Sequence, residues 1–219
     1  MPRTADHELR RAQMAEAVHR LIAHDGLDAA TMAAVAREAG FSVGLVQHYF
    51  ASKDDLLLFA YERMTADQLA RVARLVTEGE ADEQPIRAIL LRCMPQLWPL
   101  DEVRRGEYRV NRAFHTRSLD NPTVAEVARQ TAASVRAQVA RAVENGKECG
   151  EVAKHADAEL LAVELTAMIE GLADDLYREP ELRVGERTAA EAAQVILERR
   201  LAAVFPGECR HYRGRSETD

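Results

Sequence analysis

The stretch from Thr31 to Leu57, TMAAVAREAGFSVGLVQHYFASKDDLL, carries the signals for two short helices joined by a tight turn and followed at once by a third helix. Thr31 is a favourable N-cap, and apolar side chains recur behind it at helical spacing, at Met32, Val35, Ala36 and Ala39. Gly40 supplies the positive φ that ends a helix without a Cβ clash, and Ser42 is able to cap the next helix. The segment therefore predicts a helix-turn-helix.

The second of these helices has an inward and an outward face. At about 100° per residue, Val43, Val46 and Phe50 share the face that we expect to be buried. The outward face then consists of four residues, with Gln47 at its flank: Gly44, Leu45, His48 and Tyr49. Since the second helix of this motif enters the DNA major groove with its N-terminal residues nearest the bases, this face is the candidate reading surface.

The third helix opens with Ser52-Lys-Asp-Asp55, a start that resembles a capping box. Lys53 lies in its first turn, where the helix dipole disfavours a cation. The chain has only 3 lysines against 26 arginines, so a lysine at this position is not a consequence of composition. A nearby phosphate would account for it.

Residues from about Arg10 to Met64 resemble the DNA-binding domain of the TetR (tetracycline-repressor-like) family of bacterial one-component regulators. The resemblance is carried without a gap by Gly26, Thr31, Val35-Ala36, Ala39-Gly40, Gly44, Tyr49-Phe50, Lys53 and Leu56. Gln47 departs from the family, which often has a tyrosine on the DNA backbone there, although Gln is able to hydrogen-bond phosphate or adenine. The Val46-Gln-His-Tyr-Phe50 run is similar to that of a subgroup that includes the choline-sensing betaine-pathway repressors.

The motif and the resemblance together predict where the chain contacts DNA. Ser42 to Leu45 are expected nearest the base edges, His48 within reach of a base or phosphate, and Tyr49 with its hydroxyl on a phosphate. The full predicted set is Thr31, Ser42, Val43, Gly44, Leu45, Gln47, His48, Tyr49 and Lys53.

Composition and charge limit the class of protein. The 219-residue chain has a net charge of −7, whereas residues 1–53 contain six basic and six acidic residues and are neutral. A neutral DNA-binding head is mild evidence against tight non-specific binding. Three widely spaced cysteines and no apolar N-terminal run predict a reduced, cytoplasmic protein that does not span a membrane.

Long runs with a period of 3.6 residues, and none with a period of two, predict an all-α fold. We expect a helix-turn-helix domain over residues 1–53, an effector-binding and dimerisation domain over 54–205, and a flexible tail over 206–219. A helix over 52–77 would connect the two domains. Further helices are expected over 102–115, from Pro122 to about Asn145, over 157–177, and from the capping box Thr188-Ala-Ala-Glu191.

The resemblance implies a homodimer and a small-molecule effector that binds in the helical C-terminal part. The last two helices resemble the family's dimerisation helices, and their candidate interface residues are Leu165, Ile169, Leu172, Leu176, Val195, Ile196 and Leu201. Large or acidic side chains supply the candidate effector residues, which are Met94, Trp98, Tyr108, Phe114, Met168, Glu170 and Asp174. Core packing is the alternative role for each large side chain, whereas Glu170 and Asp174 would offset a cationic ligand or form an exposed acidic face.

Two other classes of protein were weighed against a regulator. Gly40-Phe-Ser-Val-Gly44 matches the G-x-S-x-G nucleophile motif of hydrolases, but it follows a predicted helix where that motif requires a strand. The histidines form no HExxH motif and no i, i+4 pair, so we expect no metal, no cofactor and no catalytic site. A protein-binding adaptor remains as an alternative because the head is neutral. The sequence thus predicts a repressor that binds a palindromic operator on double-stranded DNA as a dimer and is released by an effector.

Overall fold

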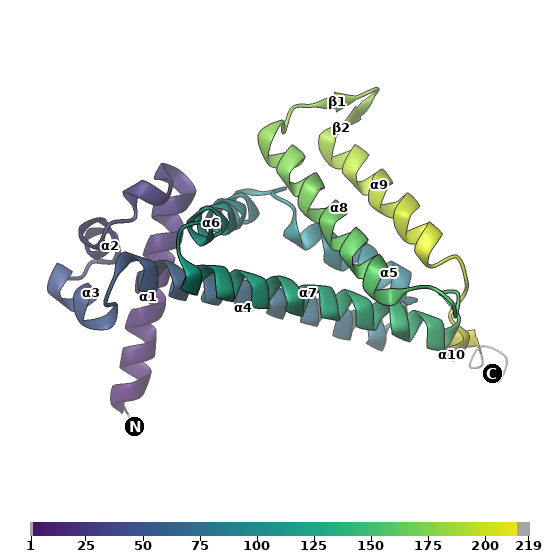
Figure 1. The fold of residues 1–219 in the computed structure, drawn as a ribbon, viewed down its shortest axis with the longest axis horizontal. Helices are drawn as coiled ribbons and strands as arrows, with labels where there is room; N and C mark the ends of the chain where they lie inside the picture. The colour runs from purple at the N-terminus through teal and green to yellow at the C-terminus, as the bar shows by residue number, and fades with distance from the viewer. Residues whose placement is uncertain (1, 214–219) are drawn as a thin grey trace. The chain divides into compact units, whose positions relative to one another are not determined.

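The computed structural model describes residues 2–213, with side chains from 7 to 211, and these residues fold into helices and one short hairpin (Figure 1). They fall into two compact units. The first unit contains residues up to Leu69 together with Asp101–Arg129, and the second contains Ala70–Leu100 and the residues from Gln130 onward. Two long helices, α4 (Lys53–Ala81) and α7 (Pro122–Cys149), contribute to both units. The all-α prediction is confirmed.

The first unit is built from helices whose ends are set by local side chains. Its other elements are α1 (Pro2–Asp25), the 3-10 helix η1 (Leu27–Ala29), α2 (Met32–Ala39), α3 (Val43–Tyr49) and α6 (Glu102–Ser118). The Thr31 hydroxyl accepts from the backbone N–H of Ala34, and the Ser42 hydroxyl accepts from that of Leu45. Gly40, with φ of 73°, ends α2 in the left-handed conformation. The predicted helix-turn-helix is therefore confirmed at each of its caps.

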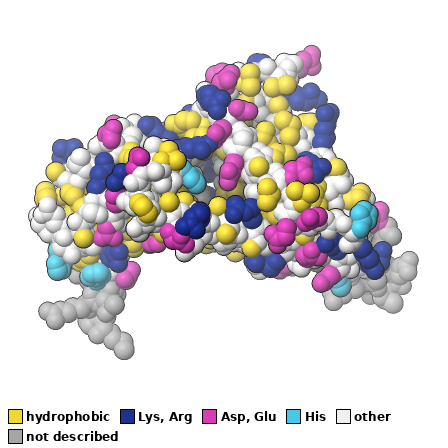
Figure 2. Space-filling view, viewed as in Figure 1, with side chains coloured by type: hydrophobic (Ala, Val, Ile, Leu, Met, Phe, Trp, Pro, Cys, Tyr) yellow, Lys and Arg dark blue, Asp and Glu magenta, His cyan; other side chains and the backbone are white. Residues whose placement is uncertain are grey.

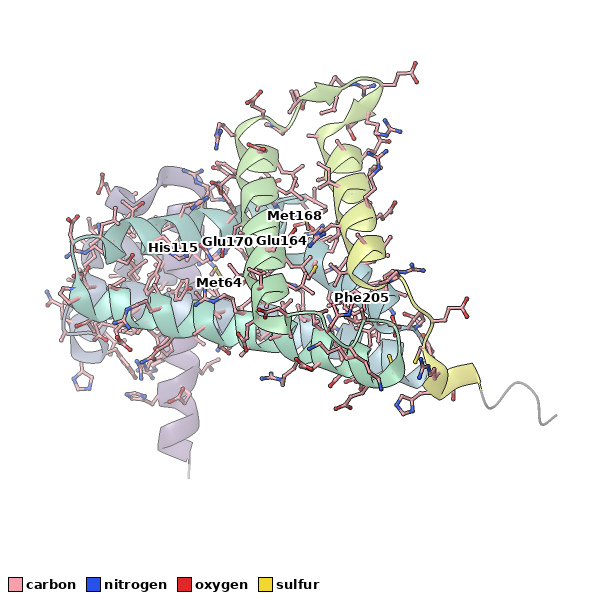
Figure 3. The ribbon with its side chains drawn as sticks, turned by 45° about the vertical axis from the view of Figure 1, so that its right-hand side comes forward. Met64, His115, Glu164, Met168, Glu170 and Phe205 are labelled. Atoms are coloured by element: carbon pink, nitrogen blue, oxygen red, sulfur yellow. The ribbon has the colours of Figure 1, made fainter. Side chains whose placement is uncertain are left out.

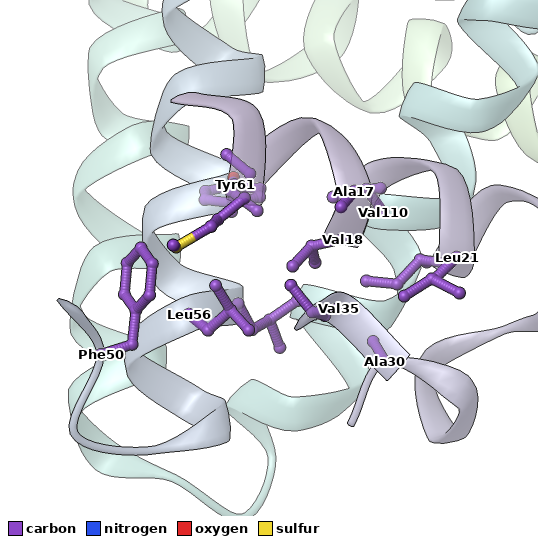
Figure 4. Packing of buried hydrophobic residues seen from close by; sticks show 14 of the residues in the cluster. Ala17, Val18, Leu21, Ala30, Val35, Phe50, Leu56, Tyr61 and Val110 are labelled. Atoms are coloured by element: carbon purple, nitrogen blue, oxygen red, sulfur yellow. The ribbon is translucent and has the colours of Figure 1, made fainter. Parts of the chain in front are cut away.

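The core of the first unit lies where α1 packs against α2 and α6. Val18, Val35 and Leu56 meet there, together with Tyr61 and Val110 (Figure 4). The Tyr61 and Phe114 rings are stacked with centroids 3.7 Å apart. This core holds the helix-turn-helix to α6, and the Arg109 guanidinium on α6 adds a hydrogen bond to the Ala23 carbonyl oxygen near the end of α1.

The second unit joins α8 (Ala158–Arg178) and α9 (Ala189–Val204) to α5 (Ile86–Cys93) and the 3-10 helix η2 (Met94–Leu97). Asp157 caps α8, and Thr188 with Glu191 forms the predicted capping box of α9. The two-residue strands β1 (Arg183–Val184) and β2 (Arg187–Thr188) pair antiparallel around Gly185, whose φ is 64°. The sequence analysis did not predict this hairpin, because two residues are too few to show alternation.

Helix lengths and the tail differ from the sequence prediction. Helix α4 runs to Ala81 where the prediction ended at 77, and α6 runs to Ser118 where it ended at 115. The predicted flexible tail is wrong over residues 206–213: the Gly207 N–H donates to the Glu151 carbonyl oxygen at 3.0 Å, and Arg210–Arg213 forms the short helix α10. The rest of that predicted tail, 214–219, lies outside the described residues. In the part of the chain that is described, no helix has the length and apolar character needed to cross a membrane.

Candidate nucleic-acid interface and effector residues

The outward face of α3 is exposed in the first unit. Ser42, Gly44, Gln47 and His48 are all accessible to solvent. A Cβ added at Gly44 would meet no atom within 4 Å, so the backbone of the first turn is open to a close approach. This is the surface that a recognition helix presents to base edges.

The predicted orientation of α3 is wrong in two places. Val43 is 40% exposed, whereas Leu45 and Tyr49 are half-buried and pack against the core. Phe50 explains the error, because its φ of −133° and ψ of 121° place it in extended backbone after the helix has ended. Counting Phe50 as helical rotated the predicted inward face away from Leu45. Val43 instead joins the exposed surface, where an apolar side chain is able to contact a thymine methyl group.

Tyr49 is held by its neighbours. Its ring lies 4.5 Å from the His7 ring of α1 and 5.6 Å from the His48 ring, the second contact being edge-on. Sequence reasoning missed His7, because a histidine near the start of the first helix carries no sequence signal that relates it to position 49. Aromatic neighbours restrict the tyrosine side chain, which is a property of a side chain that positions a hydroxyl for a phosphate.

Lys53 lies at the start of α4 beside two acidic residues that bond within the protein. The Asp54 carboxylate accepts two hydrogen bonds from the Arg117 guanidinium, each at 2.7 Å, and one from the Asn121 side-chain amide at 2.8 Å. These hydrogen bonds, that of Arg117 above all, lower the pKa of Asp54. Asp55 accepts from the Ala51 N–H, so this carboxylate also bonds inward. The positive end of α4 and Lys53 therefore remain favourable for an anion.

Charged side chains of both signs are interspersed over the face shown in Figure 2. In the first unit the Arg20 guanidinium pairs with Glu38 at 2.6 Å, which links α1 to α2. The Arg11 guanidinium lies 4.1 Å from the centre of the Phe59 ring, so part of its charge is used within the fold. The arrangement favours contacts at defined phosphates over a broad basic surface.

The predicted effector residues belong to both units, and each unit is taken by itself. In the first, Tyr108 is half-buried and Phe114 is fully buried in the core. In the second, Met94 and Trp98 are buried, Met168 and Asp174 are half-buried, and Glu170 is exposed. Figure 3 shows Met168 and Glu170 on α8.

Trp98 differs from an ordinary core residue in one respect. Its side chain is 1% exposed, and its indole Nε1 has no hydrogen-bond partner. A buried N–H without an acceptor costs free energy, about 1–3 kcal/mol, and calls for an explanation. A ligand that supplies an acceptor is one.

An open depression of about 720 Å³ lies in the second unit, beside the hairpin and the first turns of α9. Its lining is polar and charged for the most part: Glu186, Arg187, Ala190, Glu191, Gln194 and Val195. None of the predicted effector residues is among them, and Val195 is a predicted interface residue. The depression is therefore a surface feature of α9, separate from the buried Trp98.

The seven predicted interface residues divide by burial. Leu165, Ile169, Leu176 and Leu201 are buried within the protomer, which places them in its own core, whereas Leu172 and Val195 are half-buried and Ile196 is 45% exposed. Burial within the protomer prevents a side chain from forming the surface of an interface. Exposed apolar residues not in the prediction, Leu160 at 64% and Val163 at 50%, lie on α8. Apolar side chains are visible over α8 and α9 in Figure 2.

An exposed recognition helix on a helix-turn-helix, joined to a second helical unit, defines a DNA-binding regulator of transcription. Residues 15–60 match the family model described as bacterial regulatory proteins, tetR family. Residues 85–206 match the model described as BetI-type transcriptional repressor, C-terminal. The chain belongs to the TetR family of transcriptional regulators, and its C-terminal part is of the BetI type, as the resemblance in the sequence predicted.

Individual proteins give the same result. The chain is 36% identical over 95 residues to the regulator PksA of Bacillus subtilis, a match that spans 43% of this chain and 46% of that protein. It is 30% identical over 175 residues to the regulator BetI of Burkholderia mallei, covering 78% of this chain and 84% of that protein. A solved putative transcriptional regulator of Saccharomonospora viridis, in complex with choline, has a TM-score of 0.73 at 25% identity and covers 86% of this chain and 93% of that chain. The chain is thus a ligand-responsive, DNA-binding transcriptional regulator.

Proposed function

We propose that the protein is a homodimeric repressor that reads a palindromic operator with α3 and is released by a small quaternary ammonium compound. The observation that carries the DNA-binding part is the exposed face of α3, with Val43 and Gly44 in its first turn and Lys53 at the start of the next helix. In this mode Ser42 to Leu45 lie nearest the base edges. Thr31, Tyr49 and Lys53 contact phosphates, while Gln47 and His48 reach either a phosphate or a base.

A dimer follows from the geometry of the operator. Two recognition helices bind two half-sites about 34–36 Å apart, one turn of DNA, and a two-fold axis makes the operator palindromic. The exposed apolar residues of α8 and α9, Leu160, Val163 and Ile196, support these two helices as the dimer surface. Gly171 on α8 also faces open space, which permits a close approach by another helix.

The proposed effector class rests on Trp98. An indole face is the best aromatic partner for a quaternary ammonium cation, and the unpartnered N–H fits a ligand with a hydroxyl or carboxylate acceptor. Choline and glycine betaine both have this combination. The solved relative that contains choline supports the same class of ligand. Since Trp98 is buried, the ligand must select a conformer in which this side chain is accessible, and that preference is what couples effector to DNA.

Helix α6 offers a route for this coupling within the first unit. Its Arg109 guanidinium bonds to the Ala23 carbonyl oxygen, and its Arg117 holds Asp54 in the first turn of α4. A shift of α6 would therefore move the ends of two helices that carry the reading head. We propose that α6 transmits the change to α3.

Fluorescence anisotropy tests the proposal with the purified protein and DNA from its own upstream region. We expect binding that resists an unrelated competitor duplex and whose log affinity falls linearly with log salt. Choline or glycine betaine should then weaken it, by a factor of about 5–150. The absence of salt-dependent binding to any upstream fragment would favour the adaptor alternative.

The variant W98F tests the effector contact separately, because it keeps an aromatic ring and removes the N–H. It should bind the operator as the wild type does and unfold at about the same temperature, since the N–H has no protein partner. Its response to choline should require about ten times more ligand. Tetramethylammonium has the charge without an acceptor, so W98F should reduce the preference for choline over tetramethylammonium; an unchanged preference would remove Trp98 from the ligand site.

A further inference from the structure

Three residues of the second unit that are far apart in sequence bring soft and hard metal ligands together. Cys149 ends α7, Glu151 follows it by two residues, and Cys209 lies between α9 and α10. The two sulfur atoms and one carboxylate oxygen all lie within 4.8 Å of one another. Cys149 and Glu151 are buried, and Cys209 is half-exposed. The cluster is unrelated to the reading surface on α3.

The Glu151 carboxylate is fixed by the backbone. Its Oε1 accepts from the Ile86 N–H at 2.8 Å and its Oε2 accepts from the Arg87 N–H at 3.0 Å, so it caps α5. This capping role explains why a carboxylate that is 1% exposed is tolerated, but it does not explain the two sulfurs. Backbone donors on a ligating carboxylate are the usual outer-shell partners of a metal site, because they orient the ligand.

The separation of the ligand atoms suits a tetrahedral ion. Zinc–sulfur and zinc–oxygen bonds of about 2.3 and 2.0–2.2 Å give sulfur–oxygen and sulfur–sulfur edges of about 3.5–3.8 Å. The Cys149 Sγ lies 3.4 Å from Glu151 Oε1, to which it donates a hydrogen bond. A metal ion would take the place of that thiol proton with little change in the distance between the two atoms.

The segment after α9 holds Cys209 close to the other two residues. The Gly207 N–H donates to the Glu151 carbonyl oxygen at 3.0 Å, and a Cβ at Gly207 would come within 2.2 Å of the Gly150 carbonyl oxygen. Only glycine permits so close an approach. The Arg210 side chain lies against Gly150, which places a cation beside a site with a net negative charge.

We propose that Cys149, Glu151 and Cys209 form a binding site for a thiophilic divalent metal ion, with Zn²⁺ as the physiological choice. Two thiolates and one carboxylate bind the ion, and water completes the tetrahedron on the side of the half-exposed Cys209. The ion joins the end of α7, the start of α5 and the segment after α9. Each thiol releases one proton as it binds.

Cadmium titration of the reduced, metal-free, full-length protein tests the site through its ultraviolet thiolate-to-metal absorption. We expect one Cd²⁺ per protomer in the wild type and in C93S, whose altered residue lies elsewhere with its Sγ near the Val72 carbonyl oxygen. C149A and C209S should each lose about half of the absorbance and at least tenfold in affinity. No absorption band at micromolar free Cd²⁺, or a band that persists at full height in C149A and C209S, would overturn the proposal.

A second measurement does not depend on the folding of the variants. Excess Zn²⁺ should slow alkylation of Cys209 at least tenfold in the wild type and in C93S, because a metal-bound thiolate is blocked. It should also raise the unfolding temperature of these two proteins and not that of C209S. C209S changes one atom of a half-exposed side chain, so its circular dichroism should match the wild type. Alkylation that Zn²⁺ leaves unchanged would contradict the site.

Discussion

The two units place their polar chemistry on opposite sides of their surfaces. In the first unit the polar residues of α3 are exposed, and the buried Glu107 carboxylate accepts from the Gln68 amide at 3.0 Å. In the second unit the unusual polar groups are internal: the unpartnered indole of Trp98, the buried Glu151, and Cys149. Burial and the neighbouring Glu151 carboxylate raise the pKa of the Cys149 thiol to about 11, so this thiol is protonated at neutral pH.

This difference matches what each unit binds. DNA is a large, rigid polyanion that is read by exposed groups on a firm core, so the first unit needs a satisfied interior and a polar surface. A small ligand or an ion is bound by groups that the protein has already removed from water, so the second unit retains buried donors and acceptors. Substitutions on α3 should therefore change binding without changing stability, whereas substitutions inside the second unit should change both.

The largest effect is expected for G44E on the reading face. The new side chain meets no protein atom, and replacing a helical glycine gains up to about 1 kcal/mol of helix propensity, so stability should hold or rise. A carboxylate at the DNA surface should reduce operator affinity more than a hundredfold in the anisotropy assay. The control A66E adds the same charge on the exposed face of α4 and should bind nearly normally. Tight operator binding by G44E would remove α3 from the interface.

The dimer surface is tested by I196E on α9. Ile196 is 45% exposed, so the protomer should remain folded while light scattering reports a monomer, and operator binding should weaken at least tenfold. L119E, at a leucine of the first unit that is 82% exposed, is the matched control and should remain a dimer. L201E should instead unfold the second unit because it buries a charge. An intact I196E dimer would place the interface on other residues.

A smaller effect is expected for K53A. Loss of one phosphate contact per protomer should weaken operator binding about three- to tenfold and reduce the slope of log affinity against log salt by about one per site. Unrelated DNA should be affected to the same extent, because a phosphate contact carries no sequence information. Lys154 is exposed in the second unit, and K154A should leave both the affinity and the slope as they are.

The smallest effect is expected for D54N, and it depends on pH. Because the folded protein lowers the pKa of Asp54, the carboxylate stabilises the fold above its ordinary pKa of about 3.9 and loses this contribution as the pH falls through and below that value. The unfolding temperature of D54N should therefore be a degree or two below the wild type at pH 7, and the difference should narrow below about pH 4. D67N, at an exposed residue of α4, should show neither change.

The sequence was sufficient where a few neighbouring residues determine the structure. Thr31, Gly40 and Ser42 act within one turn of the chain, and the helix-turn-helix follows from them. The orientation of α3 was wrong because helical periodicity was extended to Phe50, whose backbone leaves the helix under packing from the rest of the unit. The interface prediction had a similar cause, since an apolar helix does not indicate which apolar face its own protomer covers.

Contacts between distant residues were beyond sequence reasoning. The pairing of Asp54 with Arg117 and the meeting of Cys149 with Cys209 both depend on how separate helices pack. Cysteines 60 residues apart with no short motif are typical of unrelated thiols, and the sequence analysis treated them so. Only the fold of residues 206–213 against Gly150 and Glu151 brings them together.

Two glycines of the reading head differ in what requires them. Gly40 has a φ of 73°, so the fold itself selects against other residues there. Gly44 is helical and surrounded by open space, so the protein loses helix stability by keeping it and gains no packing in return. Selection at position 44 must come from outside the protein. Among descendants of this chain that acquire new operators, position 44 should change together with the DNA sequence while position 40 remains glycine.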